Sequence, residues 1–207
     1  MRQFKSFQFG KKQVTAIHLQ EDGEHRYLWI AFNNNGDGTC DLRKVDAGDF
    51  TQIYADITGI DCNRINDMTE HAGYLYLAVD DEIRLGYYYS LSAPLITNGS
   101  RGKTLYTNES PIRVVYDGTY SYFLTPGLAS GEPAKIIKTE QYNMSIDTVI
   151  DLQISGDIIT NAIGITVNGA LASGGSLWVV TGDNPAKLAR VFEASGGGYS
   201  IQITDLL

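Results

Sequence analysis

The chain has 207 residues, of which 43% are hydrophobic and 19% charged, a balance typical of a folded globular protein. Its net charge of −8 and pI near 4.8 exclude a strongly basic face for phosphate backbones, so we expect no nucleic acid or membrane partner. Thirteen tyrosines, and 22 glycines against five prolines, favour strands joined by tight turns.

Residues 1–13 predict an N-terminal strand or arm. Phe7 and Phe9 share one face of this strand, and Ser6 and Gln8 share the other. Such an exposed strand closes a ring within the chain or adds to a sheet of a neighbouring subunit, and Phe7 and Phe9 are candidate partner-binding residues. The same stretch has no apolar signal-peptide core, and no window approaches the roughly 18 apolar residues of a membrane span. We therefore expect a soluble protein made in the cytoplasm.

Four short strands are expected in the first unit, separated by polar turns. They are Val14–Leu19, Tyr27–Phe32, Leu42–Val45 and about Phe50–Ile57. No helical periodicity interrupts them.

A hairpin from Gly73 to Tyr89 is the clearest local signal of the second unit. An apolar strand, Tyr74–Val79, is followed by an acidic turn and by a second strand rich in β-branched and aromatic residues. The second strand ends in Tyr87, Tyr88 and Tyr89. Because alternate side chains of a strand face opposite ways, we expect at least one of these tyrosines to be exposed and to bind a partner.

The hairpin pattern recurs along the chain at a nearly constant interval. Its anchor aromatics Trp29, Tyr76, Tyr122 and Trp178 are separated by 47, 46 and 56 residues. Repeats of about 50 residues with four strands each predict an all-β, small β-propeller of about four four-stranded blades, and a β-sandwich is the alternative. The expected domain spans residues 14–207, with blades at about 14–61, 62–108, 109–155 and 156–207.

The units resemble propeller blades in general. Gly73, Leu75, Tyr76 and Ala78 are similar to the G-x-L-Y-x-A motif of NHL-like and YVTN-like repeats, and the four-unit count resembles hemopexin-type propellers. The Trp-Asp ending of WD40 blades and the double glycine of kelch blades are absent from the sequence. The resemblance implies a fold and no residue roles.

The loop from Asn33 to Asp41 predicts a calcium site. Its oxygen-bearing side chains Asn33, Asn35, Asp37 and Asp41 are spaced as the ligands of a hard cation. The pattern resembles the hairpin loops of integrin-type propellers, although two of the four ligands here are neutral amides. A plain hairpin loop is the alternative, because Asn and Gly adopt positive φ readily. No other cofactor is expected.

The remaining reactive side chains show no recognisable motif. Cys40 and Cys62 form no zinc pattern, and we expect two reduced thiols over a disulfide. The three histidines have no ligand at suitable spacing, so we expect them at the surface. Ser195 lacks the G-x-S-x-G context of a hydrolase nucleophile.

These observations favour a non-enzymatic structural or interaction protein whose partners are other protein subunits of an assembly. Acidic, cysteine-poor all-β chains rich in Tyr, Asn and Gly are similar to virion components of tailed phages, which implies a tail or capsid accessory protein. The first alternative is a carbohydrate-binding propeller lectin, with a glycan partner. The second is a small hydrolase, whose carboxylates would converge from distant blades.

Overall fold

The computed structural model describes residues 12–33, 38–71, 74–80, 82–89, 93–95, 101–104, 110–128, 130–140 and 146–206. It is all-β. Among the described residues there is no α-helix, and one short 3₁₀ turn, η1 (Leu171–Ser173), interrupts the strands. None of the described helical segments has the length and hydropathy needed to cross a membrane.

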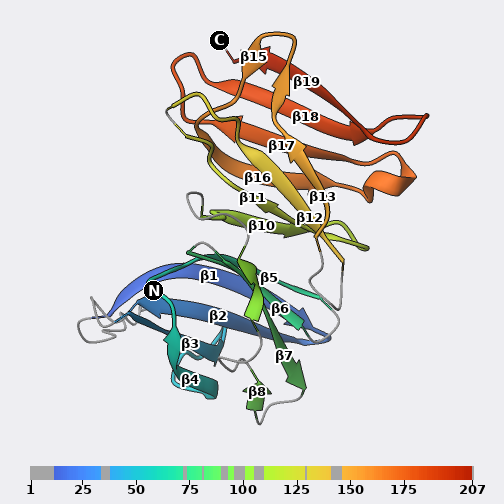
Figure 1. Ribbon diagram of the computed structural model, residues 1–207. Coiled ribbons are helices and arrows are strands. Elements are labelled where there is room, and N and C mark those ends of the chain that lie inside the picture. Colours follow the sequence, from blue (N-terminus) through green and yellow to red (C-terminus); the bar gives the residue numbers. More distant parts are fainter. Residues whose placement is uncertain are drawn as a thin grey trace, which may run out of the picture.

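Apart from one two-stranded hairpin, the described strands form four antiparallel sheets, which we call blades 1 to 4, and the first four strands of each blade follow the order of the chain (Figure 1). Blade 1 holds β1 (Gln13–Asp22), β2 (His25–Asn33), β3 (Thr39–Asp46) and β4 (Ile53–Asp61). Blade 2 holds β5 (Ile65–His71), β6 (Tyr74–Val79), β7 (Glu82–Tyr89) and β8 (Ala93–Leu95), and β9 (Arg101–Thr104) also pairs with β7.

Blade 3 holds β10 (Arg113–Tyr116), β11 (Ser121–Leu124), β12 (Lys135–Thr139) and β13 (Ile146–Asp151). A small hairpin of β14 (Gln153–Ile154) and β15 (Asp157–Ile158) follows. Blade 4 holds β16 (Ala162–Asn168), β17 (Ser176–Thr181), β18 (Lys187–Glu193) and β19 (Tyr199–Asp205). The expected small propeller of about four four-stranded blades is confirmed.

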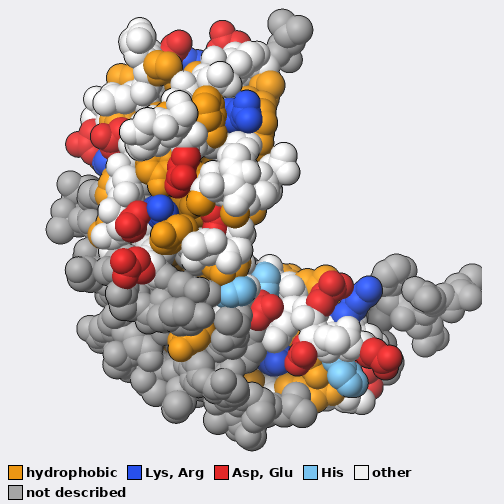
Figure 2. Space-filling view, turned by 90° about the vertical axis from the view of Figure 1, so that its right-hand side faces the viewer, with side chains coloured by type: hydrophobic (Ala, Val, Ile, Leu, Met, Phe, Trp, Pro, Cys, Tyr) orange, Lys and Arg blue, Asp and Glu red, His pale blue; other side chains and the backbone are white. Residues whose placement is uncertain are grey.

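The blades follow one another along an arc. The first strands of consecutive blades contact each other, β1 with β5, β5 with β10 and β10 with β16, so they line the inside of the arc. In the space-filling view the molecule is a crescent with a hollow on one side (Figure 2). Three of these inner strands carry a bulge near their start, at Thr15, Asn66 and Ile163, which is a structural repeat at the same place in three blades.

Most of the core lies between blades. The predicted anchors Trp29, Tyr76 and Tyr122 have no exposed surface, and each packs against the blade that follows its own. Burying one such side chain contributes about 2–3 kcal/mol, and the aliphatic residues packed around it add to the stability of each blade junction. Trp178, the fourth anchor, lies on the face of blade 4 that points away from blade 3 and is half-buried.

Hydrogen bonds from inner-strand side chains also join the blades. The Asn66 amide donates to the carbonyl of Pro111 (2.9 Å), and the Asp67 carboxylate accepts from the backbone N–H of Val114 (3.0 Å). Burial raises the pKa of Asp67, and the hydrogen bond from Val114 opposes that shift. These contacts fix blade 3 on blade 2.

Cys40 and Cys62 form a disulfide, with their Cα atoms 5.7 Å apart. The bond joins the start of β3 to the crossing between blades 1 and 2. The expectation of two reduced thiols is corrected, because the ladder between β3 and β4 pairs Cys40 with Ile60 and so brings residue 62 beside it.

Candidate functional site

A row of side chains crosses blade 1 on the face that packs against blade 2. Strand pairing places His18 of β1 opposite Trp29 of β2, and Trp29 opposite Lys44 of β3. Trp29 is fully buried and Lys44 is 6% exposed, whereas His18 is only half-buried. Because β1 lies at the inside of the arc, His18 is the member of this row nearest the hollow.

Glu70 faces this row from blade 2. It lies on β5 opposite Leu75, whose side chain belongs to the core between blades 1 and 2, so Glu70 points toward blade 1. Its carboxylate interacts electrostatically with both His18 and Lys44. In Figure 2, histidine and acidic side chains gather in the hollow of the crescent. The junction of blades 1 and 2 therefore brings an imidazole, an ammonium and a carboxylate together.

The imidazole of His18 is suited to accept a proton. Burial lowers its pKa from the ordinary value, and the negative charge of Glu70 opposes that shift only in part. Its Nε2 atom is buried and makes no hydrogen bond within the part of the chain that the structure describes. A neutral histidine with an unengaged ring nitrogen is the usual form of a general base near neutral pH.

Lys44 lies in an aromatic environment. Its Nζ atom is 4.1 Å from the centre of the Tyr27 ring and 5.5 Å from that of Trp29. Burial lowers the pKa of Lys44, and the charges of Asp22 and Glu70 oppose the shift. The Trp29 indole is held in place because its Nε1 donates to the side-chain oxygen of Gln20 (3.0 Å).

The same position in blade 3 behaves differently. Lys138 lies opposite the anchor Tyr122, as Lys44 lies opposite Trp29, and it is equally buried. Burial lowers the pKa of Lys138 as well, but hydrogen bonds with Tyr199 and Asp147 outweigh it and the pKa is raised. The Lys138–Asp147 ion pair is 3.0 Å long. Lys138 is thus held as a structural cation by its hydrogen bonds, whereas burial outweighs the neighbouring charges at Lys44.

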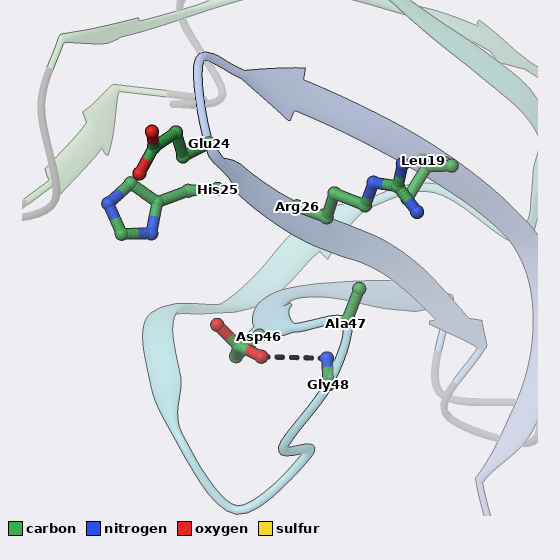
Figure 3. Close-up of a pocket in the computed structure, with 7 residues that line it drawn as sticks. All are labelled: Leu19, Glu24, His25, Arg26, Asp46, Ala47 and Gly48. Carbon is green, nitrogen blue, oxygen red and sulfur yellow. Dashed lines mark hydrogen bonds between the residues drawn. The ribbon is translucent and has the colours of Figure 1, made fainter.

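A pocket of about 400 Å³ lies on blade 1, where the β1–β2 turn meets the β3–β4 loop. It is lined by Leu19, Glu24, His25, Arg26, Asp46, Ala47 and Gly48 (Figure 3). Asp46 accepts hydrogen bonds from the backbone N–H groups of Gly48 (2.7 Å) and Asp49 (2.9 Å), which fixes the loop. Asp46 also pairs with Tyr27 across β2 and β3, so the pocket adjoins the aromatic wall around Lys44. Its volume lies at the lower end of the range for small-molecule sites.

Two neighbouring clusters are structural. His71 stacks on Tyr116 with ring centres 4.0 Å apart, between blades 2 and 3. Asp117 accepts from the Tyr122 hydroxyl (2.9 Å) and from the backbone N–H of Leu171 (3.1 Å), between blades 3 and 4. Burial, with Asp117 as a second cause, raises the pKa of Tyr122 far above its ordinary value. Both clusters join neighbouring blades.

The residues predicted to bind calcium are only partly described. Asp41 is buried, pairs with Lys12 and accepts from the backbone N–H of Gly59 (3.0 Å), so both carboxylate oxygens are engaged. Asn33 ends β2, while Asn35 and Asp37 lie outside the described residues. No group of three or more His, Cys, Asp or Glu side chains able to hold a metal occurs in the described ranges. The calcium site stays a prediction.

The predicted partner-binding residues also remain untested. Phe7 and Phe9 lie outside the described residues. The backbone of Tyr87, Tyr88 and Tyr89 forms the end of β7 and pairs with β8, but the structure does not describe the side chains of these residues.

Sequence reasoning missed His18, Lys44 and Glu70. His18 was expected at the surface because no ligand stands near it in the sequence, but it lies within β1 and is half-buried. Glu70 comes from another blade, 52 positions further along the chain. The sequence does contain one signal, the period-2 alternation of β1 and β5. It assigns His18 and Glu70 to faces of blades 1 and 2 that meet when the two blades pack in chain order.

Comparison with known proteins supports the fold. No family model matches the chain, and no curated protein matches its sequence. Among solved structures it is similar to a "putative 6-phosphogluconolactonase" from Bacteroides fragilis, with 11% identity and a TM-score of 0.61 over 91% of this chain and 56% of that one. The chain thus spans little more than half the length of that protein.

Two further structures align less well. A GH43 endo-arabinanase from Bacillus licheniformis has 12% identity and a TM-score of 0.44 over 92% of this chain and 72% of that one. A neuraminidase-like protein from A/bat/Guatemala/164/2009 has 10% identity and a TM-score of 0.48 over 96% of this chain and 58% of that one.

These comparisons correct the functional expectation. A non-enzymatic virion component was expected from composition, but the structure that aligns with a TM-score of 0.61 is named as a putative enzyme, and the comparisons give no support to a phage component. The physical reason is that an acidic composition rich in tyrosine and glycine reflects strands and tight turns. It therefore indicates the fold and does not indicate the function.

Proposed function

We propose that this chain carries a hydrolase site for a small, hydroxyl-rich ester or lactone at the junction of blades 1 and 2. The observation that carries the proposal is that His18 and Lys44, whose pKa values are both lowered by burial, each interact electrostatically with Glu70 across the junction of blades 1 and 2. Perturbed titratable groups that face a hollow are characteristic of reactive sites.

The reaction follows from these two groups. The half-buried imidazole of His18 accepts a proton from a water molecule while the water oxygen bonds to the acyl carbon. The positive charge of Lys44, in a medium of low dielectric, stabilises the negative charge that develops on the carbonyl oxygen. The bond from the acyl carbon to the leaving oxygen then breaks, and the leaving oxygen takes the proton back from His18. Glu70, whose negative charge raises the pKa of His18 in part, stabilises the transient imidazolium.

The substrate class is proposed from the fold and the pocket together. The Bacteroides protein shares the fold, and its name describes a lactonase. The pocket of Figure 3 carries the polar side chains of Arg26 and His25 as well as the carboxylates of Glu24 and Asp46, which suits a polar ligand with several hydroxyl groups.

Turnover measurements test the proposal. Purified protein is assayed with glucono-δ-lactone and with p-nitrophenyl acetate, and His18→Gln is compared with Ser195→Ala, which removes a hydroxyl from the exposed turn between β18 and β19 in blade 4. We expect hydrolysis above the buffer rate, a loss of about 100-fold or more in His18→Gln, and little change in Ser195→Ala. The rate should rise with pH through a pKa below 6.5, because burial lowers the pKa of His18. Absence of turnover, or full activity in His18→Gln, would refute the proposal.

A further inference from the structure

The two ends of the arc carry faces that are covered everywhere else in the molecule. We call the two faces of a blade the leading face, on the side of the preceding blade, and the trailing face, on the side of the following blade. At each of the three junctions, a trailing face packs on the leading face of the next blade. The anchor aromatics Trp29, Tyr76 and Tyr122 mark the trailing faces of blades 1 to 3, and all three are fully buried.

In the described ranges, no core cluster covers the trailing face of blade 4. Its anchor Trp178 is half-buried, as are Val180, Leu188 and Phe192 on the same face. Arg190 lies opposite Trp178 and between two rings, 5.5 Å from that of Trp178 and 4.9 Å from that of Phe192. Its Nε atom is buried and has no hydrogen-bond partner among the described residues. A buried donor of this kind is stabilised by an acceptor brought by another surface.

The leading face of blade 1 is also separate from the other blades. Ile30, Phe32 and Val45 form a small cluster of their own, which includes no residue of another blade in the described ranges. Around it, Ile17 is 58% exposed and Ile53 is 51% exposed. In blades 2 to 4 the corresponding faces are buried in the junction clusters.

We propose that two copies of this chain associate head to tail, the trailing face of blade 4 in each copy packing on the leading face of blade 1 in the other. The three junctions within the chain already show how a trailing face with an aromatic anchor fits an apolar leading face. A second copy supplies the one leading face that remains available on the described molecule. Two such heterologous contacts close a ring of about eight blades, within the range known for propellers.

Mass measurement across micromolar concentrations tests the ring. The full chain should have twice the 22.7 kDa mass of one copy. Ile17→Glu on the leading face and Phe192→Glu on the trailing face should each give monomers that keep the strand signal in circular dichroism. Val149→Glu is the matched control, because Val149 is an exposed apolar residue of blade 3, which has neighbours on both faces, and it should remain dimeric.

Mixing the two monomeric variants separates this arrangement from a symmetric contact. Each variant keeps one intact face, so an equimolar mixture of Ile17→Glu and Phe192→Glu should regain a dimer held by a single contact. The proposal is overturned by a wild-type chain that stays monomeric, by dimers that survive both substitutions, or by a mixture that remains monomeric.

Discussion

Lys44 and Lys138 occupy the same position in blades 1 and 3, each directly across the sheet from the anchor aromatic of its blade. Both are 6% exposed, yet the pKa of Lys44 is lowered and that of Lys138 is raised. The difference lies in the partners, since Lys138 has hydrogen bonds to Tyr199 and Asp147 that outweigh its burial. The same position in two blades thus carries a lysine, and the pKa of that lysine is shifted in opposite directions.

Titration of the lysine side chains should detect these opposite pKa shifts. We expect Lys44 to lose its proton at a lower pH than Lys138, because burial dominates at Lys44 and hydrogen bonding dominates at Lys138. Carbon-13 NMR of the labelled lysines, assigned with Lys44→Met and Lys138→Met, measures both. Equal titration midpoints, or a lower midpoint for Lys138, would contradict the assignment of Lys138 as the structural cation.

The Lys138–Asp147 ion pair predicts a pH-dependent contribution to stability. A hydrogen bond from Lys138 holds the pKa of Asp147 below its ordinary value, so the stabilisation is present above the unfolded pKa of about 4 and is lost as pH falls through the folded pKa. Asp147→Asn should therefore lower the free energy of unfolding at pH 7 by less than about 1 kcal/mol, since Asp147 is over a third exposed.

Denaturant unfolding of wild type and Asp147→Asn at pH 7 and near pH 2.5 checks this dependence. The two proteins should become equally stable at the lower pH. A difference that persists or grows on acidification would show that Asp147 acts through something other than its charge.

Asp117 is expected to be the most important single carboxylate for the junction of blades 3 and 4. It also accepts from the backbone N–H groups of Thr119 and Tyr120 (both 2.8 Å), so Asp117→Ala removes four hydrogen bonds and leaves the buried Tyr122 hydroxyl without its acceptor. We expect a loss of about 2–4 kcal/mol in the free energy of unfolding. Asp205→Ala, at an exposed position of β19, is the control and should change stability by less than about 0.5 kcal/mol. Equal effects of the two substitutions would argue against this role.

Gly127 should tolerate no side chain. Its φ is +78°, and a Cβ atom would lie 2.6 Å from the backbone N of Ala134 and 2.9 Å from the carbonyl oxygen of Glu132. Gly131 in the same loop also has positive φ (+99°) but has open space around it. Thermal denaturation should show that Gly127→Ala costs at least about 1–2 kcal/mol more than Gly131→Ala, because only the former adds a clash with backbone. Similar costs would mean that the loop rearranges.

The fold was predictable from the sequence because its signal is local and repeated. The interval between Trp29, Tyr76, Tyr122 and Trp178 reflects one anchor in the second strand of each blade, and period-2 alternation identifies strands without knowledge of their neighbours. Strand boundaries and the extra pairing of β9 with β7 depend on tertiary contacts and were not predicted.

The candidate site was not predictable in the same way. His18, Lys44 and Glu70 lie on three strands of two blades, and their chemistry arises from burial and from the facing blade. By contrast, the local pattern from Asn33 to Asp41 looked like a metal loop, but Asp41 is engaged by Lys12 and by the Gly59 amide, one of which comes from before the loop and the other from after it. A motif read along the chain cannot show such competing partners.

In the proposed site, His18 and Lys44 face the same ligand. NMR titration of the protein with D-gluconate, the hydrolysis product of gluconolactone, tests this directly. We predict saturable shifts of the His18 ring and Lys44 side-chain signals, with little change at His71 and Lys138, which lie at the next junctions along the arc. Shifts confined to other blades, or none at high concentrations of gluconate, would contradict the placement of the site between blades 1 and 2.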